Sequence, residues 1–537
     1  MKRDIECLGN TPFDVLVVGG GIHGSILAWE SARAGLRTAL LEKGDFAGAT
    51  SANSLKILHG GLRYLQHLDF PRMRQSIRSR RAIAGFAPHL VRPLPCMIAT
   101  HGMGIKSRLA MGIALWMNDG VSADRNKGLP PAVHLPRGRL VRKKDYLERL
   151  KGAADPNSTG AALWYDYLCL DTERLVLAYL SEAAAAGACI CNYAEVESID
   201  SGDATDGKRV TVRDELSGAS FGVRAKVVVL AMGPWPAKRL LGEAVLPDDV
   251  PLAKGVNLVA DRPWIGAEAA GVEGVIDSGN GQPAKRFFFL VPWKGQTMIG
   301  TTYTVSSIEA YPPVVSPSEL ASIVDGVNKL VPGFGLKTDE IRHVHAGLLP
   351  ITTTQGDPSK KLQRHSHVAM PRPGVLRIDS VKYTTAPEIA RSVMRDIGRL
   401  LGRNIRGVPL AAAPASTEAI PDTVPEAVWL RLKDRYGNHA ATVLKWAASH
   451  PQWLQPVSLE EPVLRIEVMY ALREEMAVSL CDLLFRRIDV GSTHAPSEAW
   501  LAALRDLLTA EAGWDADHWV SEITKVKACF ARMGCTP

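Results

Sequence analysis

A glycine pattern close to the N-terminus constrains the fold of this chain more than any other feature. Residues 14–18 read Asp-Val-Leu-Val-Val, which is typical of a buried strand, and Gly19, Gly21 and Gly24 follow with the spacing Gly-x-Gly-x-x-Gly. The next ten residues, 25–34, have a helical composition. A glycine turn between a strand and a helix lets the backbone approach a pyrophosphate, whose charge the helix N-terminus stabilises. The segment is therefore predicted to bind a dinucleotide.

An acidic residue stands where such a unit needs one. Residues 37–42 have the pattern of a second strand and end on Glu42. A carboxylate about twenty residues beyond the glycines can accept hydrogen bonds from the ribose hydroxyls of the adenosine. An ordinary glycine turn is the competing interpretation, and the strand, helix and acidic residue together favour the dinucleotide. The motif does not separate FAD from NAD.

The rest of the chain indicates further domains. At 537 residues it exceeds the ~250–300 at which a single core stops growing. A second α/β region extends over residues 175–231, and β-rich segments between residues 251 and 303 predict an antiparallel sheet that could form one wall of a pocket. From about residue 416 the pattern changes to amphipathic helices, which predicts a separate helical domain.

Cysteines and targeting signals exclude several classes of protein. No Cys-x-x-Cys pair or zinc-like His spacing occurs, so thiols are expected and no metal site is predicted. Residues 1–12 lack the apolar core of a signal peptide, and no apolar run reaches the ~18 residues that span a bilayer. We therefore expect a cytoplasmic location. The eight cysteines are Cys7, Cys96, Cys169, Cys189, Cys191, Cys481, Cys529 and Cys535.

Positive charge is concentrated in one place. The net charge of +7 is modest for this length and does not imply a nucleic-acid partner. Five arginines nevertheless fall between Arg72 and Arg81, and Lys106 and Arg108 flank an apolar stretch over residues 109–117. A solvated helix face and a contact with anionic lipid are both open interpretations.

Two segments after Glu42 carry a resemblance to a known family. Residues 44–51 form a stretch that ends in Thr50-Ser51, and residues 56–65 read Lys-Ile-Leu-His-Gly-Gly-Leu-Arg-Tyr-Leu. The chain resembles the FAD-dependent, quinone-linked glycerol-3-phosphate dehydrogenases, in which such segments line the flavin and the substrate pocket. Further matching segments follow in the family's order along nearly the whole chain, and they are Asp171-x-x-Arg174-Leu175, Gly233-Pro234-Trp235, Lys254-Gly255, Pro292-Trp293, Gly300-Thr301-Thr302, Lys382-x-Thr384-Thr385 and Arg435-Tyr436-Gly437.

The resemblance implies an α/β fold with three parts. These are a Rossmann-like FAD-binding domain, an antiparallel-sheet substrate cap domain and an all-helical C-terminal domain. We assign residues 13–75, 160–250 and 340–405 to the FAD-binding domain, residues 76–159 and 251–339 to the cap domain, with helices that could contact a membrane, and residues 416–537 to the helical domain.

The resemblance also implies the cofactor, the reaction and the residues that serve them. The cofactor is FAD, and the reaction is hydride transfer from the secondary alcohol of glycerol 3-phosphate to flavin N5, with electrons passed to quinone in glycerol metabolism. The implied cofactor-binding residues are Gly19, Gly21, Gly24, Glu42, Thr50, Ser51, Lys56, His59, Gly60, Gly61, Gly233, Trp235, Lys382 and Thr384. The implied substrate-binding residues are Arg63, Tyr64, Lys382 and Thr384, and the catalytic candidates are His59, Arg63, Lys382 and His345.

The sequence departs from the family at a position that bears on the substrate. The family's Gly-x-Arg-Pro segment supplies a main phosphate ligand, and here Leu349 of Gly347-Leu348-Leu349-Pro350 stands in place of that arginine. Arg342, Arg364 or Arg391 could supply the missing cation. His345 is a candidate base because a neutral imidazole can accept a proton near pH 7. The family's Gly-Gly before the matching lysine is also replaced, by Ser380-Val381.

Three alternatives for the function stay open. The first is oxidation of glycerol 3-phosphate or a related polyol phosphate at the cytoplasmic face of the inner membrane, with quinone as acceptor. The second keeps the scaffold and changes the substrate to another hydroxylated or amino compound, or the acceptor to oxygen, and Leu349 favours a changed substrate. The third is a non-catalytic flavoprotein. The sequence is compatible with a homodimer.

Overall fold

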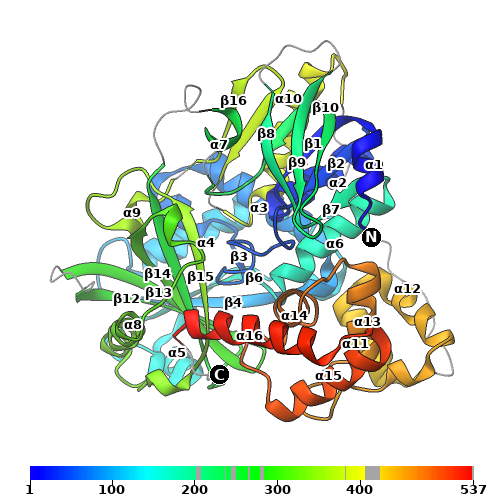
Figure 1. Ribbon diagram of the computed structural model, residues 1–537. Helices are drawn as coiled ribbons and strands as arrows, with labels where there is room; N and C mark the ends of the chain where they lie inside the picture. The colour runs from blue at the N-terminus through cyan, green and yellow to red at the C-terminus, as the bar shows by residue number, and fades with distance from the viewer. Residues whose placement is uncertain are drawn as a thin grey trace.

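The structure is a computed structural model of the chain, and it forms two large sheets and a group of C-terminal helices (Figure 1). The first sheet belongs to the predicted dinucleotide-binding part, and the second to the predicted cap. The described residues are 1–200, 207–235, 238–242, 250–263, 266–277, 283–363, 365–380, 382–405 and 424–534.

The first sheet has the parallel centre of a dinucleotide-binding fold. Its strand order is β16-β17-β10-β1-β2-β7, and β9 and β8 extend it from β10. Four neighbouring pairs, from β17 through β10, β1 and β2 to β7, run parallel. Val15, Leu16 and Val17 of β1 are fully buried, as expected for a strand covered on both faces. The bounds are β1 (Pro12–Val18), β2 (Thr38–Leu41), β7 (Cys189–Cys191), β8 (Ala194–Ile199), β9 (Lys208–Asp214), β10 (Ser220–Leu230), β16 (His367–Arg372) and β17 (Val375–Asp379).

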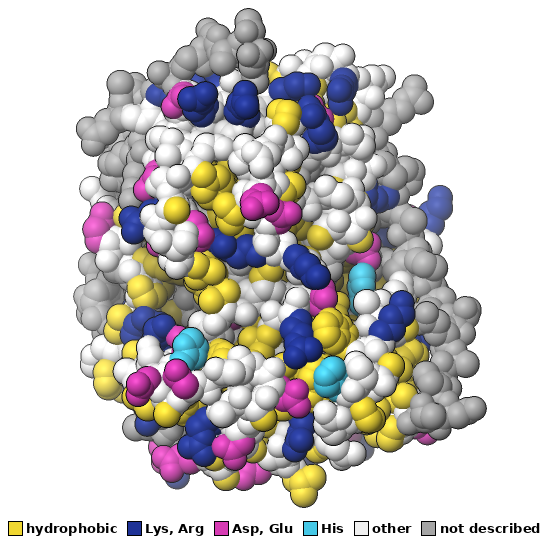
Figure 2. Space-filling view, turned by 45° about the vertical axis from the view of Figure 1, so that its right-hand side comes forward, with side chains coloured by type: hydrophobic (Ala, Val, Ile, Leu, Met, Phe, Trp, Pro, Cys, Tyr) yellow, Lys and Arg dark blue, Asp and Glu magenta, His cyan; other side chains and the backbone are white. Residues whose placement is uncertain are grey.

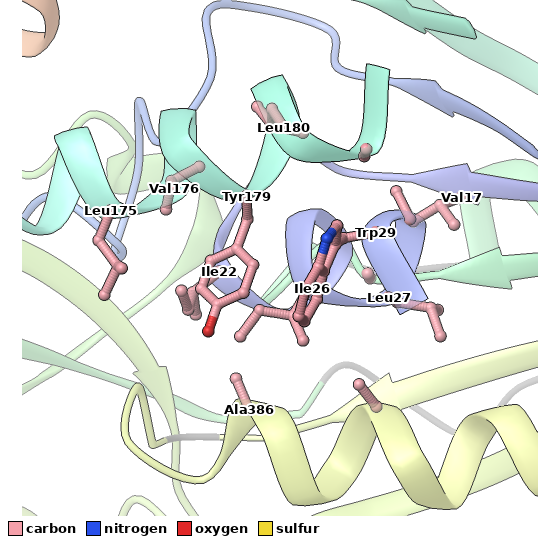
Figure 3. Close-up of a cluster of buried hydrophobic side chains, with 14 of the residues drawn as sticks. Val17, Ile22, Ile26, Leu27, Trp29, Leu175, Val176, Tyr179, Leu180 and Ala386 are labelled. Carbon is pink, nitrogen blue, oxygen red and sulfur yellow. The ribbon is translucent and has the colours of Figure 1, made fainter. Parts of the chain in front are cut away.

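Three helices from distant parts of the sequence cover one face of this sheet. They are α2 (Ile22–Arg33), α6 (Thr172–Ala185) and α10 (Ala386–Leu400), and α2 contacts both of the others. Figure 3 shows Ile22, Ile26 and Trp29 of α2 lying beside Tyr179 of α6, with Ala386 of α10 on the other side. Trp29 and Tyr179 meet edge to face at 5.3 Å between ring centroids. This core fixes the start of α2, where the glycine turn lies.

The second sheet is the predicted cap sheet, with one difference. Its strand order is β15-β11-β14-β13-β12-β4-β6-β3, and β5 pairs with β6. The pairs are antiparallel except for β4 with β12, which are parallel, so the sheet is mixed. The bounds are β3 (Ile57–Leu58), β4 (Val91–Thr100), β5 (Arg139–Arg142), β6 (Gly160–Cys169), β11 (Leu252–Ala260), β12 (Ala269–Asp277), β13 (Pro283–Trp293), β14 (Gln296–Ser306) and β15 (Ile341–Pro350).

The pairing of three strands differs from the predicted domain boundaries. Strands β3, β6 and β15 fall in ranges assigned to the FAD-binding domain, but they hydrogen-bond within the second sheet. The reason is that strand partners are far apart in the sequence, so the pattern of one strand does not reveal the sheet it joins. The predicted division of the chain needs correction at residues 57–58, 160–169 and 341–350.

Helices around the second sheet come mostly from the segments between its strands. Helix α4 contacts β6 and β5, α5 contacts β6, and α8 contacts β12. The bounds of these and the other helices outside the C-terminal group are α1 (Ile5–Asn10), α3 (Phe70–Phe86), α4 (Arg108–Val121), α5 (Lys143–Leu150), α7 (Lys238–Leu241), α8 (Pro317–Leu330) and α9 (Pro358–Lys361). Within the described segments, no helix combines the length and the apolarity needed to cross a bilayer.

The C-terminal part is helical over residues 424–534, where the structure describes no strand, and the predicted fold class is confirmed. Residues 406–423, which include the predicted start at 416, lie outside the described residues. Figure 1 shows these helices (orange to red) gathered beneath the second sheet, with α16 running below β4. The bounds are α11 (Glu426–Tyr436), α12 (Ala440–Leu444), α13 (Arg465–Glu474), α14 (Leu480–Asp482), α15 (Glu498–Ala512) and α16 (Ala516–Arg532).

The predicted basic cluster on α3 is engaged in internal contacts. Arg74 and Arg81 both pair with Asp124, and Arg78 pairs with Glu388 of α10. Arg80 is buried against Asp166, and the Arg72 guanidinium lies 4.6 Å from the centre of the Tyr64 ring. These arginines tie α3 to its neighbours, so the cluster no longer supports a lipid contact. On the face in Figure 2, Lys and Arg side chains gather at the upper edge and mix with Asp and Glu below it.

Candidate functional site

A cavity of about 790 Å³ lies between the two sheets. It opens at the carboxyl ends of β1 and β2, which is where open α/β sheets bind ligands. Strands β11, β14 and β15 form the opposite wall through Gly255, Asn257, Thr301, Tyr303 and Leu349. The sequence predicted a pocket wall from the strands between residues 251 and 303, which include β11 and β14; β15 lies outside that range. The volume is in the range of sites for cofactors and small molecules.

The glycine turn packs so closely that side chains would not fit. Gly19 has φ 113°, and a Cβ atom there would lie 2.5 Å from the carbonyl oxygen of Ala231. A Cβ on Gly24 would lie 1.9 Å from the Gly19 oxygen. Gly21 is the N-cap of α2, and Ser51 Oγ accepts the Ile22 N–H at 3.0 Å. Gly19, Gly21 and Ser51 line the cavity, and Gly24 supports them from behind.

Glu42 lies at the end of β2, on the cavity wall. Its carboxylate accepts the Gly20 N–H at 2.7 Å and the Gly44 N–H at 3.0 Å. Burial raises the pKa of Glu42, and the two backbone N–H groups oppose that shift. Each carboxylate oxygen can accept a further hydrogen bond, as a ribose diol requires. The bare backbone of the turn, the helix N-terminus and Glu42 together fit the adenosine diphosphate half of FAD.

Four other predicted cofactor residues also line the cavity. They are Thr50, Gly233, Trp235 and Thr384. Thr50 Oγ1 donates to the Leu348 carbonyl at 2.9 Å, which joins the loop after β2 to β15. Trp235 packs edge to face on Tyr311, at 4.8 Å between ring centroids. These contacts bring loops from both sheets to one cofactor-sized space.

Lys56 has a different role from the predicted one. Its ammonium is buried and lies 3.0 Å from both carboxylate oxygens of Glu173. It also donates to Thr172 Oγ1 at 2.8 Å and to the Ala52 carbonyl at 2.7 Å. These contacts use all three donors of the ammonium. Lys56 therefore holds the loop before β3 onto α6, and it is not among the residues that line the cavity.

His59 lines the cavity and is oriented by a buried carboxylate. Its Nδ1 lies 3.2 Å from Asp166 Oδ2, and Asp166 Oδ1 accepts the Gly60 N–H at 2.7 Å. Burial alone would raise the pKa of Asp166, but the hydrogen bond from His59 and the charge of Arg80 lower it to about 2. Because Nδ1 faces an ionised carboxylate, it carries the imidazole proton, and Nε2 is the acceptor. Gly60 is needed because a Cβ would meet the Arg80 guanidinium at 2.4 Å.

Tyr64 and Lys382 meet in the cavity although 318 residues separate them in the chain. The Lys382 ammonium donates to the Tyr64 hydroxyl, and both side chains line the cavity. Burial and the charges of Arg72 and Arg63 lower the pKa of Lys382 to about 7. Gly61, at φ 87°, gives Tyr64 its room, since a Cβ would lie 2.6 Å from the ring. Arg63 itself is exposed and stands beside the cavity, within electrostatic reach of Lys382.

His345 is not placed as a base should be. It is buried and lies 4.5 Å from the His343 ring and 5.8 Å from the Trp293 ring, measured between centroids. Burial and the nearby charge of Lys56 move its pKa well below the usual range, so the imidazole is neutral. It packs beside Trp293 and is not among the residues that line the cavity, so its position does not support the predicted catalytic role.

Leu349 lines the cavity, as its match to the family's arginine predicts. The replacements suggested from sequence lie elsewhere, because Arg342 pairs with Asp261 and Arg391 pairs with Glu388. Arg364 lies outside the described residues. Among the described residues, the lysines and arginines that line the cavity are Lys43, Lys382 and Arg486.

Sequence reasoning missed three site residues, Asp166, Arg486 and Asn257. Asp166 carried no local signal, because it reaches His59 only through the pairing of β3 with β6. Arg486 comes from the C-terminal helices and lines the cavity, where it pairs with Asp45 and Asp482. The opposite wall adds Asn257, whose Oδ1 accepts the Thr301 hydroxyl at 2.7 Å. These contacts join segments that are distant in the sequence.

Comparison with known proteins identifies what this arrangement resembles. A family model described as FAD dependent oxidoreductase matches residues 14–376, and one described as the C-terminal domain of alpha-glycerophosphate oxidase matches residues 385–518. A glycerol-3-phosphate dehydrogenase from Mycobacterium leprae is 31% identical over 97% of this chain and 89% of its own length. One from Synechocystis is 27% identical over 100% and 99%. A glycerol-3-phosphate dehydrogenase from Bacillus halodurans, solved in complex with FAD, has the same fold, with a TM-score of 0.73, 21% identity, and coverage of 98% of this chain and 96% of that one.

Proposed function

Because this chain belongs to the family of FAD-dependent oxidoreductases, we propose that it oxidises the secondary alcohol of glycerol 3-phosphate or a related polyol phosphate and passes the electrons to a quinone. The observation that carries the proposal is the group of His59, Tyr64 and Lys382, which lines the same cavity as the glycine turn. This group offers a proton acceptor and a cation, and oxidation of a phosphorylated alcohol requires both.

FAD, when bound, supplies the acceptor for a hydride from the substrate carbon. We propose that Gly19, Gly21 and Glu42 hold its adenosine and pyrophosphate. The remaining cofactor contacts would come from Thr50, Ser51, Gly233, Trp235 and Thr384, which line the cavity. Gly24, Gly60 and Gly61 would act indirectly, by allowing the turns that carry these contacts.

His59 is proposed as the base that accepts the hydroxyl proton at Nε2. Its Nδ1–H points to Asp166, which stays ionised at neutral pH. A carboxylate in this position holds one tautomer and stabilises the imidazolium that forms when Nε2 takes the proton. The Gly60 N–H and the Arg80 guanidinium keep the carboxylate in place. The same arrangement would let His59 return the proton to solvent through its exposed edge.

Lys382 is proposed as the main cation for the substrate phosphate, with Tyr64 as a hydroxyl donor. A lysine whose pKa is about 7 is only partly charged in the empty site at neutral pH. A phosphate dianion favours the charged form and would raise that pKa. Arg63 stands close enough to add to the positive potential. Lys382 and Arg63 would together supply part of the positive charge that Leu349 does not.

Leu349 favours a second candidate, in which the substrate is another hydroxylated or amino compound. An apolar side chain on the cavity wall cannot bind a phosphate, and losing one charge-assisted contact typically costs a few kcal/mol in a dry site. The electrons could then pass to oxygen in place of quinone. The chemistry at His59 would be the same in either case.

Anaerobic flavin bleaching separates these candidates. The purified flavoprotein would be mixed with glycerol 3-phosphate, longer polyol phosphates, glycerol and amino acids, and the absorbance of oxidised flavin followed. Bleaching by glycerol 3-phosphate and not by glycerol supports the proposal. Bleaching only by unphosphorylated compounds would replace it with the second candidate. A yellow protein that no donor bleaches would indicate a non-catalytic flavoprotein.

A peripheral membrane contact is proposed on the apolar stretch over residues 109–117 that the sequence suggested, without the arginine cluster on α3. Leu109, Ile113 and Trp116 repeat with helical spacing along α4, and 77%, 51% and 78% of these side chains are exposed. Met103 and Ile105, in the loop before α4, are exposed as well. An apolar helix face beside an apolar loop is suited to the headgroup boundary of a bilayer. We propose that this surface, at the cytoplasmic face of the inner membrane, gives access to quinone; a homodimer stays a prediction.

A further inference from the structure

Two cysteines of the C-terminal helices face each other at short range. Cys481 lies on α14 and Cys529 on α16, and their Sγ atoms are 3.8 Å apart. Both side chains are half-buried and both are free thiols. Figure 1 shows α14 directly beside α16, and the two helices are in contact. A disulfide requires an Sγ–Sγ distance of about 2.05 Å, so a shift of less than about 2 Å would join the two sulfurs.

A separate contact holds the two helices in this register. Glu522 of α16 is buried, and its carboxylate accepts the Leu480 N–H at 2.7 Å. This bond fixes the first turn of α14 next to the helix that carries Cys529. The Ser479 side chain caps the same turn. The short sulfur separation is therefore built into the packing of α14 on α16.

One sulfur of the pair has the environment of a nucleophile. Arg532 Nη2 lies 3.0 Å from Cys529 Sγ. A hydrogen bond from Cys481 and the charge of Arg532 outweigh burial and lower the pKa of Cys529 to about 6, whereas the pKa of Cys481 is raised. A cation next to a half-buried sulfur favours the reactive thiolate. Cys529 is thus the attacking sulfur and Cys481 the resolving one.

We propose that Cys481 and Cys529 form a redox-active dithiol that hydroperoxides oxidise to an intramolecular disulfide. The Cys529 thiolate attacks one peroxide oxygen, the O–O bond breaks, and with one proton the products are Cys529 sulfenic acid and an alcohol, or water from hydrogen peroxide. Cys481 then attacks the sulfenic sulfur, the S–O bond breaks, and water leaves with the Cys481 proton. Two thiols and one peroxide give one disulfide, one alcohol and one water.

The site connects to the cofactor cavity through one side chain. Asp482 follows Cys481 and pairs with Arg486, which also pairs with Asp45. Arg486 and Asp45 line the cavity. A disulfide that shifts α14 would therefore move Asp482, which pairs with Arg486 next to the loop that contains Asp45.

The other cysteines offer internal controls. Burial raises the pKa values of Cys96, Cys169 and Cys191, so these three are inert thiols at neutral pH. Cys189 is half-buried like the proposed pair and also neighbours a second thiol, that of Cys7. Burial and the contact with Cys7 raise its pKa, and its thiol donates to the Asp4 carbonyl at 3.7 Å. Cys189→Ser is therefore the matched control variant.

The test is a mass measurement on the reduced, full-length flavoprotein after removal of reductant. One equivalent of hydrogen peroxide at pH 6 should lower the intact mass by about 2 Da, the loss of two hydrogens in a disulfide. Tryptic digestion without reduction should then link the peptides 474–486 and 528–532. The peptide 533–537, which carries Cys535, should stay unlinked. At pH 6 about half of Cys529 is thiolate, whereas only about 0.3% of an ordinary cysteine is. A thiolate of lower pKa is a weaker nucleophile, and after this correction Cys529 should react with peroxide about 15-fold faster than an ordinary cysteine.

Variants assign the roles of the two sulfurs. Cys481→Ser should stop at a sulfenic acid on residue 529 that dimedone traps, and Cys529→Ser should slow the reaction at pH 6 by about tenfold or more. Arg532→Gln should slow the reaction of Cys529 with peroxide more at pH 6 than at pH 8, because at pH 8 the thiolate forms without help from the arginine. Cys189→Ser should behave as the parent. The proposal is overturned if the parent keeps all its thiols, if the link joins other cysteines, or if Cys529→Ser reacts at the parent rate.

Discussion

Replacement of Lys382 by glutamine gives a test of the substrate pocket whose size and pH dependence both follow from the structure. The ammonium lines the cavity, and its pKa is about 7. A charge-assisted contact contributes about 1.5–3 kcal/mol, so Lys382→Gln should raise KM for glycerol 3-phosphate about 10- to 150-fold at pH 6, where the lysine is about 90% protonated. The depressed pKa means that the charge is present below pH 7 and lost above it. At pH 8 only about 10% of the lysine is charged. The ratio of KM for Lys382→Gln to KM for the parent should therefore be about tenfold smaller at pH 8 than at pH 6.

Steady-state flavin reduction with an artificial acceptor, measured from pH 6 to pH 8, provides both KM values. The second ionisation of the substrate phosphate cancels in the ratio, because parent and variant see the same substrate. Lys382→Arg is the matched control: it keeps a cation that stays charged throughout, so its KM relative to the parent should fall as the pH rises. A ratio that is the same at pH 6 and pH 8, or a KM that Lys382→Gln does not change, would refute the assignment of Lys382 as the phosphate cation.

Three further changes test other parts of the site. Glu42→Gln should weaken FAD binding about 10- to 100-fold, because an amide cannot accept both backbone N–H bonds. Dialysis followed by flavin fluorescence would measure the affinity for FAD. An unchanged affinity would contradict the assignment of Glu42 to the ribose. Leu349→Arg should lower KM for glycerol 3-phosphate about tenfold and leave KM for glycerol unchanged. Leu349→Met is the control. An equal change in both KM values would contradict a phosphate position near this wall. Leu109→Ser with Trp116→Ser should reduce sedimentation with phosphatidylglycerol vesicles about tenfold or more, and full retention would exclude this surface as the membrane contact.

The glycine turn and its acidic residue were predictable because most of their determinants are local. Gly24 is required by its contact with Gly19 in the same βαβ unit, and Glu42 follows the next strand of that unit; Gly19 also packs against Ala231, which follows β10. Every part of the unit lies within about thirty residues, so the order of residue types carries the geometry. The division of residues 251–303 into strands was predictable for the same reason, since alternation within a strand is a local property.

The failures concern side chains whose partners lie far away in the sequence. Lys56 sits in a motif that lines the cavity, yet its ammonium turns toward Glu173, and no local pattern reveals which way a lysine points. His345 was attractive because of its neighbours in the chain. It shares a face of β15 with Leu349, but it lies four residues, or about 13 Å, along the strand, beside Trp293 and outside the residues that line the cavity. The basic cluster on α3 was misleading because Asp124 and Glu388, its partners, belong to other segments.

The same limit hid the contribution of the C-terminal helices, which sequence patterns alone present as a separate domain. Arg487 is fully buried and donates to both carboxylate oxygens of Asp45, and Arg486 also donates to Asp45 Oδ2. Burial would raise the pKa of Asp45, and the two arginines lower it instead, so the carboxylate stays charged. A buried carboxylate that loses both cations is strongly destabilised. Asp45 lies in the loop between Glu42 and Thr50, on the cavity wall. Removal of the helical domain should therefore disorder this loop, which is proposed to hold the cofactor, and flavin binding should be lost with it.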